Sequence, residues 1–161
     1  MDFYLIFQII TVSIAATSTM TLFSYAVSAS FREIYKEPLL LTYLMHNFRI
    51  NLSNASKNTL SWLIHYGIGG LFVTVYHYFW ARNILQLSFL HALLLGVGSG
   101  FIGIISWMIF FKLSRYQPSI DFKGFYIQLF VAHLIFALTA TAVYAISLTV
   151  ALLANTYFAP K

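Results

Sequence analysis

The sequence predicts an all-α, polytopic membrane protein: a four-helix transmembrane bundle with an interfacial amphipathic helix in its first loop. Of its 161 residues, 60% are hydrophobic and only 8% are charged, whereas soluble domains carry about 25% charged residues. So few charges cannot cover a surface that faces water. The apolar residues also gather into runs of about 20, the length that crosses roughly 30 Å of hydrocarbon. We expect one compact transmembrane domain over residues 1–161.

Four apolar segments are long enough to span a bilayer, at about residues 3–28, 60–80, 85–111 and 122–153. The first has no basic residues at its start and is interrupted by Gln, Ser and Thr, so we expect a retained helix rather than a cleaved signal peptide. The short link between the second and third predicts an antiparallel hairpin. Before the fourth segment, Ser119 or Asp121 is expected to cap the helix.

The long first loop contains a shorter apolar pattern, "EPLLLTYLMHNF" at residues 37 to 48. Pro38 suits a helix start, where its missing N–H costs nothing. A helix over about 38–48 is too short to span, and its apolar residues recur at helical spacing. It therefore predicts an amphipathic helix on the cytoplasmic membrane surface, either a structural foot between two spans, which we favour, or a docking surface for lipid headgroups or a partner. Four flanking basic residues are expected to face that membrane surface: Arg32, Lys36, Arg49 and Lys57.

The distribution of basic residues predicts the orientation of the chain. Seven of the nine Lys and Arg residues lie in the first and third loops: Arg32, Lys36, Arg49, Lys57, Lys112, Arg115 and Lys123. Only Arg82 and Lys161 lie on the other side. The positive-inside rule then places both termini outside and the two basic loops in the cytoplasm. The net charge of +5 is explained by these helix ends, and we expect no nucleic acid as a partner.

Small residues predict the faces through which the helices pack, because lipid-embedded helices associate by close approach. The third segment contains "GVGSGFIG", in which Gly96, Gly100 and Gly103 share one helical face. The second segment adds Gly67 and Gly70. We favour packing within one bundle; the alternative is that the glycine face of the third segment forms a homo-oligomer.

The first segment carries a matching stripe of small polar residues at helical spacing. Its members are Ser13, Thr17, Thr21, Ser24 and Ser28. The stripe predicts a packing face and, in an oligomer, offers a polar lining for a small pore.

Four histidines lie in or beside the predicted spans and are the candidate ligand-binding residues: His65, His77, His91 and His133. His65 and His77 are 12 residues apart, about 120° around the helix and roughly 18 Å along it, so they cannot hold one ion or haem together. The depths of the four predict an outer layer of His77 with His91 and an inner layer of His65 with His133. Structural hydrogen bonding is the favoured role; a proton relay, a ligand site, haem or a metal ion are the alternatives.

Several activities find no support in the residues. The chain has no cysteine, which excludes disulfides and thiolate chemistry. No predicted span has an Asp, Glu, Lys or Arg in its middle, which argues against an ion pump or a charged-substrate transporter of ordinary design. Glu33 and Glu37, beside Arg32 and Lys36, are expected to form a solvated charge cluster rather than a catalytic pair. Ser99 and Ser106 have no basic partner in the sequence that would make either a nucleophile.

The strings "KEPLLLTYLM", "HYGIGG", "SGFIGIISW" and "PSIDFKGFYIQLFVAHLIFAL" resemble those of small four-helix bacterial membrane proteins that carry no assigned activity. The resemblance covers most of the chain. It implies the same topology and a location in the bacterial inner membrane, and it transfers no substrate, cofactor or active residue.

Three functional hypotheses follow for this lipid-embedded chain. The favoured one is a non-enzymatic accessory, assembly or oligomeric scaffold protein, in a homo-oligomer or a larger membrane complex. The second is a bundle that binds haem, a metal or another ligand through its intramembrane histidines. The third is a small oligomeric pore or carrier. The sequence does not identify the activity, the ligand, the partner or the oligomeric state.

Overall fold

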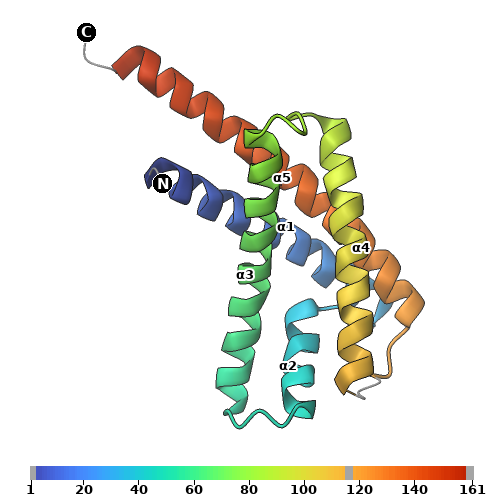
Figure 1. The fold of residues 1–161 in the computed structure, drawn as a ribbon. Helices are drawn as coiled ribbons and strands as arrows, with labels where there is room; N and C mark the ends of the chain where they lie inside the picture. The colour runs from blue at the N-terminus through green and yellow to red at the C-terminus, as the bar shows by residue number, and fades with distance from the viewer. Residues whose placement is uncertain (1–2, 115–117, 159–161) are drawn as a thin grey trace.

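The computed structural model confirms an all-α protein and describes residues 3–114 and 118–158. Within these ranges the chain forms five helices and no strand. The helices are α1 (Phe3–Phe31), α2 (Glu37–Asn47), α3 (Asn54–Ala81), α4 (Phe89–Ser114) and α5 (Phe122–Phe158). In Figure 1, α3 and α4 stand on either side of the short α2, while α1 and α5 cross obliquely behind them.

Three of the described helices, α1, α4 and α5, are long and apolar enough to cross a membrane. The 28-residue α3 is long enough but is not among them, because histidine, tyrosine and polar residues interrupt its apolar run. The outer surface is also apolar: Leu22, Leu90 and Leu113 are each about two-thirds exposed or more. Lipid chains accommodate such a surface and water does not, so the protein is a helical membrane protein.

Three helices end in the same way, with a left-handed residue that turns the chain. Arg32, Arg49 and Asn83 have φ of 56°, 54° and 55°. In each case the next residue's N–H donates to a carbonyl five residues back, as from Glu33 to Ser28 at 3.2 Å. This is the Schellman arrangement, which satisfies carbonyls at a helix end. It lets α2 fold back against the bundle immediately after α1.

Side-chain caps set where two helices begin. Ser53 accepts a hydrogen bond from the backbone N–H of Ser56, which starts α3 six residues before the predicted span at residue 60. Asp121, one of the two predicted caps, accepts from the backbone N–H of Lys123 at 3.1 Å. Polar N-caps of this kind satisfy donors that have no partner within the helix.

The glycine face of α4 packs against α5. A Cβ placed on Gly96 would lie 2.9 Å from the Cα of Leu134, and one placed on Gly100 would lie 2.8 Å from the Phe130 ring. Such distances are too short for any side chain, so glycine is needed where the two backbones meet. The face that offered a homo-oligomer contact is therefore occupied within the chain.

The polar stripe of α1 is buried, and α3 approaches it through Gly69, which was not among the predicted packing glycines. A Cβ on Gly69 would collide with the Thr17 side chain. Gly70 only reaches Ser13, at 3.8 Å, and Gly67 has open space around it. The face of α3 that contacts α1 therefore includes Gly69 and is rotated from the face predicted from Gly67 and Gly70.

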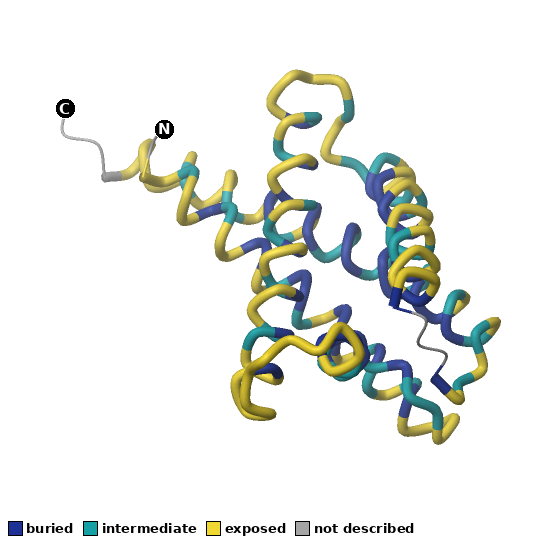
Figure 2. Tube along the Cα trace, turned by 60° about the horizontal axis from the view of Figure 1, so that its bottom comes forward, coloured by how far each residue is buried: buried dark blue, intermediate teal, exposed yellow. Residues whose placement is uncertain are grey.

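The short helix α2 buries its apolar face inside the protein. Of the apolar residues expected on the membrane surface, all but Phe48 are buried: Leu40, Leu41, Leu44 and Met45. They pack against α3 and, more sparsely, α4. Figure 2 shows buried residues on the inward faces of the helices and exposed residues on their outer faces.

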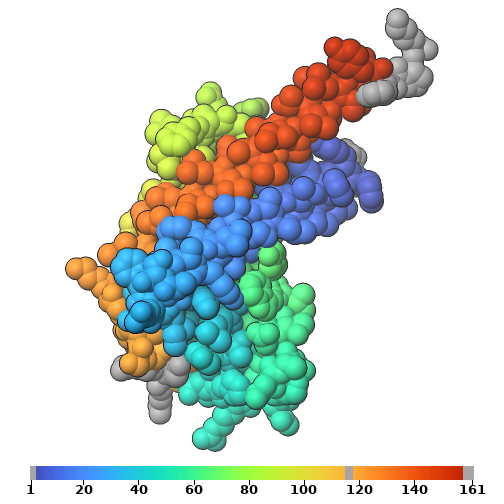
Figure 3. Space-filling view, turned by 180° about the vertical axis from the view of Figure 1, so that it is seen from behind, coloured from blue at the N-terminus to red at the C-terminus, as the bar shows by residue number. Residues whose placement is uncertain are grey.

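From behind, the beginning of α1 and the end of α5 run together out of the main body (Figure 3). Two hydrogen bonds join them: Tyr4 donates to the Ser147 carbonyl at 2.8 Å, and the Gln8 side chain donates to the Ser147 hydroxyl at 2.6 Å. The two chain ends described by the structure therefore lie on the same side of the fold.

We predict that Gly96→Leu destabilises the protein by about 1–3 kcal/mol, because the new side chain must displace the α5 backbone. Gly67→Leu is the matched control, since a Cβ there meets nothing within 4 Å. Thermal unfolding of the two purified variants in the same detergent measures the difference. Equal unfolding temperatures would contradict the α4–α5 packing described here.

Candidate functional site

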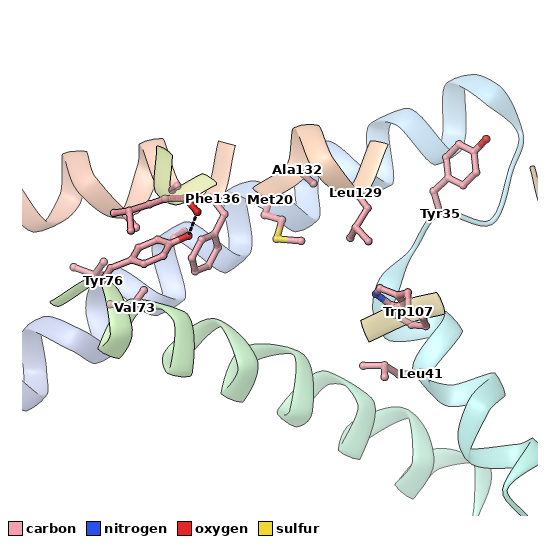
Figure 4. Packing of buried hydrophobic residues seen from close by; sticks show 14 of the residues in the cluster. Met20, Tyr35, Leu41, Val73, Tyr76, Trp107, Leu129, Ala132 and Phe136 are labelled. Carbon is pink, nitrogen blue, oxygen red and sulfur yellow. Dashed lines mark hydrogen bonds between the residues drawn. The ribbon is translucent and has the colours of Figure 1, made fainter. Parts of the chain in front are cut away.

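A cleft of about 670 Å³ separates α3 from α4. The two helices leave a common turn, and near that turn the Tyr76 hydroxyl donates to Ser99 at 2.8 Å. Below this contact α2 lies between them and keeps them apart, while α1, α5 and the start of α2 form the floor. Figure 4 shows buried side chains around the cleft, with Tyr76 and Phe136 toward one end and Trp107 and Leu41 toward the other.

The walls of the cleft are almost entirely apolar, and its edges open to the outer surface of the helices. Ile68, Leu71 and Val75 of α3 line it and are 41%, 64% and 42% exposed. Leu94 and Ile102 of α4 face them across the opening, 53% and 56% exposed. Exposed apolar edges of this kind suit contact with lipid chains.

Glu37, the first residue of α2, places a buried carboxyl group at this cleft. It is 2% exposed and lines the cleft. The expectation that Glu37 belongs to a solvated charge cluster is therefore wrong. The reason is the left-handed turn at Arg32, which folds Glu37 inward instead of leaving it at the aqueous boundary.

One oxygen of the Glu37 carboxyl group is held by two helices, and the other is left free. Oε1 accepts from the Ser24 hydroxyl of α1 at 2.8 Å and from the Gln128 amide of α5 at 3.4 Å. Gln128 also donates to Ser24 at 2.6 Å. Oε2 is buried and has no hydrogen-bond partner. Burial raises the pKa of Glu37 from 4.5 to about 7, although the hydrogen bonds oppose the shift.

His65 of α3 lines the same cleft and is fixed by α1. Its Nε2 lies 2.9 Å from the Thr21 hydroxyl, and that hydroxyl donates its only hydrogen to the Thr17 carbonyl. Nε2 must therefore be the donor to Thr21, which leaves Nδ1 of the neutral ring as an acceptor. Nδ1 has no hydrogen-bond partner among the described residues.

His133 of α5 presents a second free acceptor. Its Nδ1 donates to the Leu129 carbonyl at 2.8 Å, so Nε2 of the neutral ring carries a lone pair. The ring lies edge-on to Phe72 and against Gly103, where a Cβ would fall 2.9 Å from Nε2. Gly103 thus gives the imidazole room beside α4, at the cleft.

The two histidines of the predicted outer layer have different hydrogen-bond partners. His77 Nδ1 pairs with the Tyr144 hydroxyl of α5 at 2.7 Å. His91 Nδ1 pairs with Ser88, at the start of its own helix, at 2.9 Å. Of the inner layer, His65 and His133 line one cleft. In the part of the chain that the structure describes, no three His, Asp or Glu side chains gather as a metal-binding group.

The four basic residues expected at the membrane surface differ in exposure. Arg32 and Arg49 are exposed and Lys36 is partly buried. Lys57 is only 7% exposed, and its ammonium group lies 3.4 Å from Nδ1 of His46 on α2. Lys57 therefore takes part in fastening α3 to α2.

In the sequence, Glu37 is marked only by its position directly before Pro38, which indicates that a helix begins there. That position alone does not tell whether the helix lies inside or outside the bundle. Ser24 and Gln128, which hold the carboxyl group, are separated from Glu37 by 13 and 91 residues. No family model, curated protein or solved structure matches this chain.

We predict that the stability of the ligand-free protein falls as pH rises from about 4.5 to 7. In that window folded Glu37 keeps a proton that the unfolded chain has lost, so unfolding becomes more favourable. The shift corresponds to a loss on the order of 3 kcal/mol. Thermal unfolding from pH 4 to 8 measures it in the protein and in Glu37→Gln. A pH dependence that is the same in both would contradict the burial of this carboxyl group.

Proposed function

We propose that the protein binds a lipophilic amphiphile, taken from the bilayer, in the cleft between α3 and α4. One observation supports this proposal most directly. The cleft of about 670 Å³ has apolar walls, and the carboxyl group of Glu37 at its floor has one oxygen without a hydrogen-bond partner. Small-molecule sites span about 300–1,000 Å³ and combine apolar walls with a few polar groups. This develops the hypothesis of a ligand-binding bundle that uses its intramembrane histidines.

A small amphiphile fits the cleft better than a helix of another protein. The floor carries unpartnered polar atoms, Thr17 Oγ1 and Glu37 Oε2. A purely apolar helix face would leave both unsatisfied, at a cost of about 1–3 kcal/mol each.

The other two hypotheses have weaker support in the geometry. A scaffold role through the glycine face of α4 competes with the contact that this face makes with α5. A pore lined by the polar stripe of α1 competes with the hydrogen bonds that Thr21 and Ser24 make to His65 and Glu37.

For the topology we propose four spans, with α3 as the fourth, in the bacterial inner membrane and with both termini outside. Both ends of the described chain and the turn between α3 and α4 lie toward the top of Figure 1. The links that flank α2, the start of α3, the end of α4 and the start of α5 lie lower. These segments contain six of the nine Lys and Arg residues: Arg32, Lys36, Arg49, Lys57, Lys112 and Lys123. The positive-inside rule favours the cytoplasm for the lower side.

We predict that a reporter fused after Lys161 is non-cytoplasmic, as paired alkaline phosphatase and fluorescent-protein fusions would show. A fusion inside residues 49–53 should give the opposite result. A cytoplasmic signal after Lys161 would contradict the proposed orientation.

We predict that Gly98→Leu displaces the bound amphiphile. Gly98 lines the cleft, and a Cβ there meets nothing within 4 Å, so leucine fills the cleft without disturbing the helices. Gly67→Leu is the control at an equally open glycine outside the cleft. Mass spectrometry of organic extracts, after exhaustive washing in detergent, counts retained amphiphile per chain.

The expected result is close to one retained molecule in the unaltered protein and in Gly67→Leu, and a several-fold loss in Gly98→Leu. Equal retention in all three proteins would contradict the proposal. So would a chain that retains none, or one whose Gly98→Leu variant only loses self-association, since a second copy would then be the occupant.

A further inference from the structure

We propose that the amphiphile carries a primary ammonium head group, bound by Glu37 at the floor of the cleft. This inference rests on the proposed function and names the chemical class of its ligand: a long-chain amine. Three features of the floor support it: its charge, its hydrogen-bonding character and its spacing.

The formal charge among the residues that line the cleft is negative. Among the residues that line the cleft, Glu37 is the one acidic residue and none is lysine or arginine. The neighbouring cation, Lys36, lies over the Tyr25 ring, 4.8 Å from its centroid. A buried carboxylate without a counter-ion is costly. A cationic head group would supply that counter-ion, whereas a phosphate or carboxylate head group would meet a like charge.

Apart from the Thr17 hydroxyl, which can donate or accept, the free polar atoms at the floor are acceptors. Ser24 and Gln128 both donate to Oε1 of Glu37, which favours the ionised carboxylate and leaves Oε2 as an acceptor. His65 Nδ1 and His133 Nε2 are lone pairs, because the opposite nitrogen of each ring donates. An ammonium group has three donors and no acceptor, so its hydrogen-bonding capacity matches this set.

The spacing between the acceptor groups of the floor is set by α1. Thr21 holds His65 and Ser24 holds Glu37, and three residues along a helix advance about 4.5 Å. On the α5 side, the donor to Glu37 is Gln128 and the second imidazole belongs to His133, five residues on. The three acceptors therefore gather within about two helical turns, with the apolar walls left for the chain of the ligand.

Three ligands with one chain and different head groups test the inference: dodecylamine, dodecanol and dodecanoate. Native mass spectrometry of the full-length protein in a neutral detergent measures one-to-one binding at pH 8. We expect dodecylamine to bind at least about tenfold more tightly than dodecanol, since a charge-assisted hydrogen bond is the stronger kind, and dodecanoate to bind most weakly. Glu37→Gln should abolish the preference for the amine and keep binding of the alcohol.

The pH dependence of the unaltered protein is an independent test should Glu37→Gln fail to fold. With the pKa of Glu37 about 7, ionised carboxylate falls about tenfold between pH 8 and 6, and dodecylamine binding should weaken by a similar factor. The other titratable groups around Glu37 are Tyr25, Lys36, His65 and His133. Protonation of the histidines would also repel an amine, so the same titration of His65→Gln and of His133→Gln measures their share.

The outcomes separate this inference from the proposed function. Equal binding of dodecylamine and dodecanol, or a preference that survives Glu37→Gln, would overturn the ammonium head group. Binding of dodecanol that Gly98→Leu abolishes would still support an amphiphile site. If Gly98→Leu changes the binding of none of the three ligands, both proposals fail.

Discussion

The hydrogen bonds among Ser24, Glu37 and Gln128 join α1, α2 and α5 at one buried point, and the arrangement of the other helices depends on them. They draw the start of α2 into the bundle. Once there, α2 lies between α3 and α4 and keeps them apart below the Tyr76 contact. The cleft is therefore a consequence of a polar interaction in the interior of the protein. Each buried polar group that finds a partner also avoids the cost of an unsatisfied one.

The helix pairs differ in how tightly they meet. α5 packs closely on both α1 and α4, and glycines at positions 96, 100 and 103 bring α4 against α5. α3 is fastened mainly to α1 and α2, by the Gly69 contact, the His65–Thr21 hydrogen bond and buried Lys57. It has few contacts with α4 or α5. A bundle packed tightly on one side and loosely on the other leaves space where a ligand from the bilayer can bind.

The sequence predicted what depends on local composition and spacing. The long apolar runs indicated membrane helices, and Pro38 marked the short helix between the first two. The burial of the Ser/Thr stripe on α1 also follows from helical spacing.

The sequence did not predict that α2 lies inside the protein, because an apolar helix face can pack on a membrane surface as well as in a groove between helices. The role of Glu37 was missed for the same reason: its partners come from Ser24 and Gln128, which only the tertiary fold brings near. The packing of α3 through Gly69 rather than Gly67 and Gly70 depends on the rotation of one helix, which glycine spacing alone does not fix.

The proposed ligand site depends on Glu37 being a buried carboxyl group that binds a cation. Difference infrared spectroscopy of the full-length protein in detergent measures its titration directly, with Glu37→Gln assigning the carboxyl band. We expect a midpoint near a pH of about 7 in the ligand-free protein and a lower midpoint once dodecylamine is added. A midpoint near the ordinary value of 4.5, unchanged by the amine, would contradict this expectation.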